Sequence, residues 1–143
     1  MLPERLRENL ELLALMPDRA DRIQLLIDTA ERFREVSAEI AQRPFGEEHR
    51  VPACESEAFV WALPRTDGTL DFHFAVENPQ GISAMAMAVL LGESLSGAPL
   101  DQVAAVPRDV VYEIFGRELS MGKSMGLMGM VAMVTTYARQ ASS

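Results

Sequence analysis

The chain has 143 residues, of which 48% are hydrophobic and 24% are charged, a composition typical of folded globular proteins rather than of disordered ones. Its formal net charge of -8 argues against a nucleic-acid partner, because binding to the phosphate backbone depends on clustered Lys and Arg. The longest apolar stretch, residues 125–138, is shorter than the ~20 residues that cross a bilayer, so we expect no membrane span. The length predicts a single domain over residues 1–143.

The first residues bear on the location of the protein. The start is charged at Glu4 and Arg5 and lacks the apolar core of a signal peptide. A chain with one cysteine also fits a compartment in which thiols stay reduced. We therefore expect a cytoplasmic protein.

Two helices are predicted in the first 35 residues. Pro3 can open the first, which extends to about Leu15 before Pro17 interrupts it, and Asp18 then caps the second. One face of the first helix contains Leu6, Leu10 and Leu13. The apolar stripe of the second, with i, i+3, i+4 spacing, contains Ile23, Leu26, Ile27, Ala30 and Phe33. A short helical turn is expected over residues 37–43.

A change to a period of two after residue 57 predicts a β-hairpin. Residues 58–63 are apolar on both faces, as in a strand that is covered on both sides. Asp67-Gly68 is typical of a primed turn, which needs positive φ at its central residues. The face of the second strand expected to contact the helices contains Leu70, Phe72, Phe74 and Val76. The face expected to contact water contains Thr69, Asp71, His73 and Ala75.

The second half of the chain is predicted to be helical. Asn78 is expected to cap a helix with Pro79 at its first position, and the apolar run 82–91 continues it to about residue 97. Shorter helices are predicted at 99–105 and 107–115, and a last helix at 124–139. The order of elements predicts an α+β fold. Its small antiparallel sheet, the hairpin with room for a short third strand, is packed on one face by the N- and C-terminal helices.

Cys54 is the only cysteine in the sequence and lies just upstream of the hairpin. A lone thiol cannot close an internal disulfide or chelate a metal by itself, so any sulfur chemistry must involve a second molecule. A single cysteine is more often an inert core residue. Here, Pro52 and the polar residues Glu55 and Ser56 indicate a loop instead.

Three segments carry a family resemblance. Arg50 to Ser56 resembles the Val-x-Gly-Cys-x-Ser motif of SufE, the sulfur-acceptor proteins of iron–sulfur cluster assembly. Residues 95–103 are similar to that family's Ser-Gly-x-x-Pro-x-x-x-Ile stretch, and residues 119–127 are similar to its Leu-Ser-x-x-Arg-x-x-Gly-Leu stretch. The leucine-rich N-terminal helices match as well, so the resemblance covers nearly the whole chain in register.

The resemblance implies that Cys54 accepts a sulfane sulfur from the persulfide of a SufS-like cysteine desulfurase and delivers it to a downstream iron–sulfur scaffold. It implies no cofactor in this chain, since the pyridoxal phosphate belongs to the desulfurase. Uptake of the sulfur frees the desulfurase for another turnover, so the protein would be a carrier and activator rather than an enzyme. By analogy with thiol–disulfide exchange, the Cys54 thiolate would attack the terminal sulfur of the donor.

Three further positions matter for the comparison with the family pattern. Ala53 stands where the family has glycine, so either its backbone avoids positive φ or the loop is more restricted. Lys123 replaces the arginine of the motif and keeps its charge without its planar fork of donors. Glu77 falls near a family aspartate. The resemblance thus makes Lys123 and Glu77 candidate site residues beside Cys54.

Two other functions remain open for a protein with a lone cysteine. An iron–sulfur scaffold uses several thiolates, so this chain would have to recruit ligands from elsewhere. A thiol enzyme, such as a peroxidase or a small-molecule sulfurtransferase, needs a readily formed thiolate. Glu55 and Glu57 favour the neutral thiol of Cys54, whereas His49 and Arg50 would oppose them if the loop folded back.

The other conspicuous polar and aromatic residues are interpreted as structural. His73 is expected on the exposed side of its strand, and His49 is expected to be passive although it lies near Cys54 in sequence. Ser56 lacks the Gly-x-Ser-x-Gly pattern of a hydrolase nucleophile. Trp61 is expected to pack in the hairpin, because the chain lacks the basic groove that accompanies a stacking platform.

The methionines near the C-terminus allow two interpretations. They are Met121, Met125, Met128, Met130 and Met133. Thioethers can bind soft metals or adapt to partners. The interleaved Gly122, Gly126 and Gly129 instead indicate a helix closely approached by a neighbouring element, which favours core filling.

Overall fold

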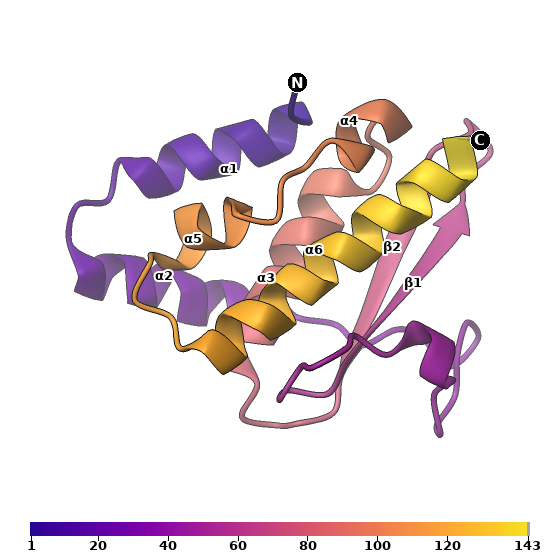
Figure 1. The fold of residues 1–143 in the computed structure, drawn as a ribbon, viewed down its shortest axis with the longest axis horizontal. Coiled ribbons are helices and arrows are strands. Elements are labelled where there is room, and N and C mark those ends of the chain that lie inside the picture. Colours follow the sequence, from indigo (N-terminus) through magenta and orange to yellow (C-terminus); the bar gives the residue numbers. More distant parts are fainter. Residues whose placement is uncertain (143) are drawn as a thin grey trace.

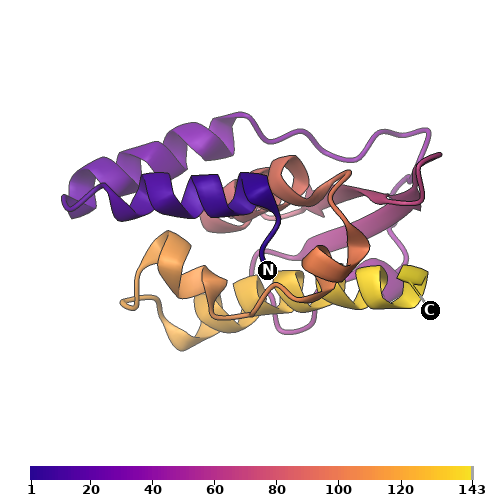
Figure 2. The same ribbon diagram turned by 90° about the horizontal axis from the view of Figure 1, so that it is seen from above.

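The computed structural model describes residues 1–142, which form six α-helices, one short 3-10 helix (η1) and a two-stranded sheet. In chain order the elements are α1 (Glu4–Ala14), α2 (Arg19–Glu31), η1 (Glu47–His49), β1 (Ala58–Pro64), β2 (Leu70–Val76), α3 (Ile82–Leu95), α4 (Leu100–Ala104), α5 (Val110–Phe115) and α6 (Met121–Ser142) (Figure 1). Viewed from above, α1 and α2 lie on one side and α6 on the other, with α3 and the hairpin between them (Figure 2). The predicted α+β fold is confirmed.

The sheet of the described residues consists of the hairpin alone. β1 and β2 pair antiparallel over their full length. The short third strand for which the sequence left room is not formed within residues 1–142. An isolated bridge between Arg50 and Phe59 lies beside β1 instead.

The turn of the hairpin is not the expected primed turn. Gly68 has a φ of 88°, but Asp67 does not have positive φ. The amide of Gly68 donates to the carbonyl of Arg65 at 3.0 Å, and the amide of Arg65 donates to the carbonyl of Thr69 at 2.8 Å. This is a longer loop with glycine in the left-handed position. Asp67 accepts hydrogen bonds from the hydroxyl and amide of Thr69, which lower the pKa of its carboxyl.

The main core lies between the hairpin and the helices. The apolar face of β2 is buried as predicted and packs on α3, while β1 packs on α6. α3 is apolar almost all round because it also contacts α1, α2 and α6. Leu6 and Leu13 are buried and attach α1 to this core, with Leu10 half-buried between them, which confirms the leucine face of the first helix.

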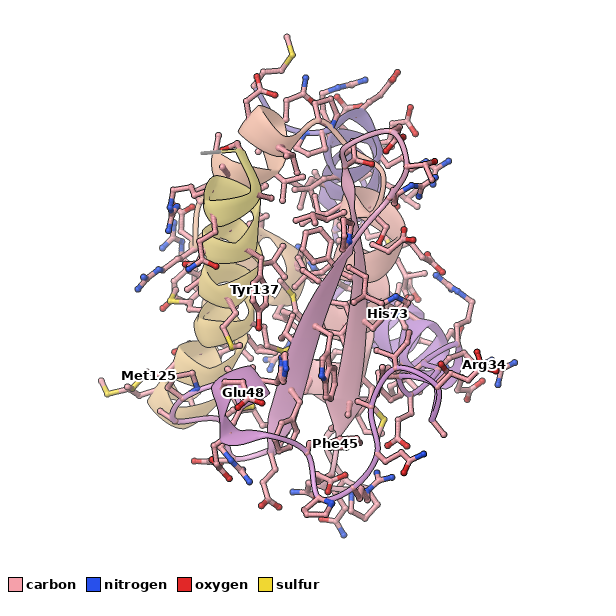
Figure 3. The ribbon with its side chains drawn as sticks, turned by 90° about the vertical axis from the view of Figure 1, so that its right-hand side faces the viewer. Arg34, Phe45, Glu48, His73, Met125 and Tyr137 are labelled. Carbon is pink, nitrogen blue, oxygen red and sulfur yellow. The ribbon has the colours of Figure 1, made fainter. Side chains whose placement is uncertain are left out.

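The sequence predicts that the other face of the hairpin contacts water, but in the structure this face is covered. Residues 33–45 cross it and bury a second apolar cluster, made of Val36, Phe45, Phe59, Trp61 and Ala75. The ring of Phe45 lies 5.2 Å from that of Phe59 and 5.0 Å from that of Trp61. His73, on the same face, is half-buried rather than exposed (Figure 3). The covering segment has little regular structure, so periodicity could not reveal it.

Several boundaries differ from the predicted ones, among them that of the helix predicted at 107–115, which begins at Val110. α3 begins at Ile82 rather than at Pro79, because the side chain of Asn78 accepts the amide of Gln80 at 2.9 Å in a local turn instead of capping the helix. Residues 37–43 form a single hydrogen-bonded turn and no helix. α6 begins at Met121, three residues earlier than predicted.

The second helix is partly as predicted. Asp18 caps α2 by accepting the amide of Ala20 at 2.8 Å. Leu26 and Ala30 are buried, but Ile23 and Ile27, expected in the same stripe, are exposed. α2 packs mainly on α3, and this contact buries a narrower face of α2 than the predicted apolar stripe.

Candidate functional site

Cys54 lies in a closed loop between η1 and β1, here called the Cys54 loop (residues 51–57) (Figure 1). The amide of Val51 donates to the carbonyl of Ala58 at 2.8 Å and closes the base of the loop. The amide of Glu57 donates to the carbonyl of Cys54 at 3.0 Å and forms a turn. The cysteine side chain is half-buried. It therefore lies on a loop, as its polar sequence context predicts, and outside the closed core.

The Cys54 loop holds two residues in the left-handed region of backbone space. Ala53 has a φ of 56° and Glu57 a φ of 53°. For residues with a Cβ, this conformation costs about 1–2 kcal/mol. The sequence left open whether the backbone at Ala53 avoids positive φ. It does not, even though alanine replaces the family's glycine. The contacts around the loop must hold it against this strain.

The first half of α6 packs directly against the Cys54 loop through glycines. A Cβ built on Gly126 would lie 3.1 Å from Cα and 3.2 Å from Sγ of Cys54. A Cβ built on Gly129 would lie 2.8 Å from Cγ1 of Val51. The sequence indicated a close approach to this helix but not that the approaching element carries the cysteine. The only signal was the i, i+4, i+7 spacing of Gly122, Gly126 and Gly129, which puts them on one helical face.

Cys54 lines a cavity of about 380 Å³ between the loop, the start of α3 and the first turns of α6. Its wall includes polar side chains of Ser56 and Lys123 and the apolar side chains of Ile82 and Leu127. Since a water molecule occupies about 30 Å³ in the liquid, the cavity has room for an added sulfur atom. The structure thus brings Cys54 and Lys123 to one cavity.

Of the charged side chains near the thiol, some form ion pairs and others do not. Arg50 is engaged by carboxylates, with Nε 2.9 Å from Glu47 and a guanidinium nitrogen 3.8 Å from Glu57. Glu55 and Lys123 both line the cavity, and neither forms an ion pair within residues 1–142. The mouth of the site therefore carries a carboxylate and an ammonium group that a partner could reach.

Glu77 does not line the cavity. Its carboxylate accepts hydrogen bonds from Arg43 at 2.6 and 3.0 Å, and Arg43 also pairs with Glu35. The hydrogen bonds that Arg43 donates to Glu35 and, second, to Glu77 raise the pKa of its guanidinium. The amide of Glu77 donates to the carbonyl of Glu57 at 3.1 Å. Glu77 thus ties the Cys54 loop to segment 33–45 from outside the cavity.

Both histidines lie in contacts away from the thiol. Nδ1 of His49 lies 2.9 Å from the carbonyl oxygen of Val60, and its ring stacks on Trp61 at 5.0 Å. His73 lies on the hairpin face that segment 33–45 covers. Within residues 1–142, neither ring forms a hydrogen bond with Cys54. Trp61 packs in the hairpin as predicted.

The methionines of α6 fall into three groups. Met130 is fully buried and Met128 and Met133 are half-buried against the core, as core filling predicts, but Met121 and Met125 are 77% and 52% exposed. Met125 points away from the body of the protein (Figure 3). Core filling is wrong for these two, because the glycine face of α6 turns toward the Cys54 loop and leaves them at the surface. Their exposure is the main feature beside the thiol that the sequence did not reveal.

Among residues 1–142, no helix combines the length and hydropathy needed to span a membrane. The same residues contain no group of three or more His, Cys, Asp or Glu side chains placed to hold a metal ion.

A comparison with protein-family models matches residues 7–138 to SufE, described as an Fe-S metabolism associated domain. The chain belongs to the SufE family. Among solved structures, it is similar to the solution structure of a hypothetical protein from Thermus thermophilus, with 25% identity and a TM-score of 0.74. That match covers 99% of this chain and 98% of the other. A comparison with curated proteins found no match.

SufE membership gives the Cys54 loop and α6 a common context, since both lie within the matched residues apart from the last turn of the helix. It supports a general role in iron–sulfur metabolism, as a sulfur acceptor. The individual roles of Cys54, Lys123 and Glu77 stay predictions.

Proposed function

We propose that this SufE-family protein accepts a sulfane sulfur on Cys54 from the persulfide of a SufS-like, pyridoxal-phosphate-dependent cysteine desulfurase and passes it to an iron–sulfur scaffold. By removing the sulfur it stimulates the desulfurase. It acts in the cytoplasm as a carrier with one transiently modified cysteine, without a cofactor of its own and not as an enzyme. The observation that supports this most directly is a half-buried thiol beside a cavity in a chain of the SufE family.

The transfer needs no oxidant or reductant beyond the donor. Cys54 loses its proton to solvent, and the thiolate attacks the outer sulfur of the donor persulfide. A sulfur–sulfur bond forms at Cys54 while the bond within the donor breaks, and the donor cysteine leaves as a thiolate. The product is a persulfide on Cys54, and the same exchange with an acceptor thiol returns Cys54 to its starting state.

The cavity suits a carrier because a persulfide must survive between two encounters. Ile82 and Leu127 supply an apolar wall, and Gly126 allows α6 to cover one side of the thiol. An outer sulfur held in this space is less accessible to small thiols in solution than one on a fully exposed cysteine. The loop must still present the sulfur to a second protein, which its position at the surface permits.

The decisive experiment is intact-mass analysis after incubation with a cysteine desulfurase of the same organism and cysteine. We expect a gain of one sulfur atom that dithiothreitol removes, because reduction cleaves the persulfide bond. Cys54→Ser should show no gain, and the wild type should raise the turnover of the desulfurase while the variant does not. Absence of the adduct on the wild type would contradict the proposal.

A second measurement separates the carrier from a scaffold. After anaerobic incubation with iron and sulfide, a carrier should give no stable visible absorption. A coloured, monomeric species that depends on Cys54 would instead favour an iron–sulfur scaffold with ligands recruited from other residues.

A further inference from the structure

We propose that the exposed methionine surface beside Cys54 is the docking site for the sulfur-donating protein, which inserts an apolar side chain next to the loop and places basic residues against Glu48 and Glu55. This inference rests on the proposed function and deepens it. It assigns a partner surface of stated chemistry to a groove here called the Met125 groove, whose apolar wall is formed by Pro52, Ala53, Met125, Met128, Met133 and Tyr137.

The Met125 groove has a volume of about 560 Å³ and lies across the Cys54 loop from the thiol cavity. Pro52 and Ala53 line the groove, whereas the next residue, Cys54, lines the cavity. A protein that covers the loop to reach the sulfur must therefore also cover the groove. Methionine walls adapt to the shape of an inserted side chain because the thioether is unbranched and flexible.

Exposed apolar side chains extend this surface around the thiol. Met121 and Met125 project from α6, and Ile82, at the start of α3, is 42% exposed and lines the thiol cavity. Large side chains of this kind on a monomer surface mark a contact area when they are grouped together. Ile82 thus shares a cavity with the atom that a donor must reach, and Met125 lies on the groove across the loop from it.

Charge determines what kind of partner fits. Glu48 lies on the groove near Tyr137, where burial first, and the Glu48 carboxylate second, raise the pKa of the Tyr137 hydroxyl. Figure 3 shows Glu48 on η1 and Tyr137 on α6, on the two sides of this surface. Glu55 lies at the other side of the loop without an ion-pair partner in residues 1–142. Arg108 also lines the groove and Lys123 lines the thiol cavity, so this surface carries charges of both signs. A donor that sets basic residues against the two carboxylates and acidic residues against the two cations complements it, whereas a second copy of this chain is repelled by the net charge of -8.

The test is the dissociation constant for a purified cysteine desulfurase of the same organism, measured by titration calorimetry. We expect Met125→Glu to weaken binding at least about tenfold, because it sets a charge in the apolar centre of the contact. Met125→Leu should bind within about twofold of the wild type, since it keeps the volume and the apolar character. The control is Ile27→Glu, which changes an apolar residue of similar exposure on α2, in the opposite layer of the protein, and should bind like the wild type.

Inorganic polysulfide separates the docking surface from the chemistry of the thiol. The Cys54 thiolate attacks a terminal sulfur of the polysulfide, which leaves as a polysulfide one sulfur shorter, and no docking is needed. All four proteins should therefore gain sulfur equally from this donor. If even the wild type takes up no sulfur from the desulfurase, the proposed function fails. If Met125→Glu binds and accepts sulfur like the wild type, only the docking inference is overturned.

Two further results bear on the occupant. Glu48→Gln combined with Glu55→Gln should reduce the salt dependence of desulfurase binding between about 0.05 M and about 0.5 M salt, because screening then has fewer charges to act on. An unchanged salt dependence would overturn the charge argument. If the isolated protein forms a dimer in light scattering that Met125→Glu dissociates, while desulfurase binding is unchanged, the groove is a contact between copies and the inference is wrong.

Discussion

Two irregular segments precede the hairpin in the chain, and they are built in opposite ways. Segment 33–45 buries the ring of Phe45 against the sheet and pairs Arg43 with Glu35 and with Glu77. The Cys54 loop has two residues with positive φ, adjoins a cavity and a groove, and has Glu55 unpaired at its side within residues 1–142. Packing in the first segment stabilises the fold. Incomplete packing around the second leaves space for a sulfur atom and for a partner.

The largest effect in this comparison is expected at the aromatic cluster. Phe45→Ala should lower the free energy of unfolding by about 3–5 kcal/mol, because it removes a buried ring that contacts Phe59 and Trp61. Urea unfolding followed by circular dichroism would measure the loss, and Phe45→Leu should recover much of it. At a temperature where the variant is folded, sulfur uptake by Cys54 should be normal. A large loss of uptake by folded Phe45→Ala would show that the two segments are coupled.

A substitution at Gly126 tests the contact between α6 and the Cys54 loop, where close packing positions the thiol. Gly126→Val should cost about 1–3 kcal/mol, because even its Cβ would lie within 3.1–3.3 Å of three Cys54 atoms. The displaced loop should react with maleimide several-fold faster than in the wild type. The matched control is Gly122→Ala, whose Cβ would meet the flexible carboxylate of Glu55, and which should gain about 0.5–1 kcal/mol from helix preference. An unchanged labelling rate in Gly126→Val would mean that α6 does not hold the loop in place.

The same contrast explains what the sequence could and could not predict. The leucine face of α1 and the apolar face of β2 follow their periodicity, since each repeats one regular contact with the core. The burial of Phe45 and the exposure of Met125 do not, because both depend on how irregular segments and a glycine face meet in three dimensions. Likewise, the structure places Cys54 and Lys123, both candidates from the resemblance, at one cavity, but no local pattern could show that Glu77 faces Arg43 instead of the cavity.

Ala53 offers a smaller test, of strain in the Cys54 loop. Ala53→Gly should raise the free energy of unfolding by about 0.5–1 kcal/mol, since relief of the left-handed conformation exceeds the added entropy of the unfolded chain. Ala105, an exposed residue at the end of α4 with a φ of -89°, provides the control. Ala105→Gly should instead destabilise by about 0.4–1 kcal/mol, because it has no strain to relieve. If both substitutions destabilise equally, the Cys54 loop is not strained at Ala53.

The smallest effect is expected at Glu77, where the two segments meet. Glu77→Gln should cost at most about 1 kcal/mol, because its ion pair with Arg43 is partly exposed to solvent. Glu93→Gln, which weakens a similar exposed pair with Arg32, provides the control for a purely structural ion pair. Denaturation and sulfur uptake should be measured on the same samples. If Glu77 is structural, both variants keep full uptake. If Glu77→Gln keeps its stability but loses uptake, the carboxylate acts in the transfer itself, as the family resemblance implies, and the division between a stabilising segment and a reactive loop is wrong.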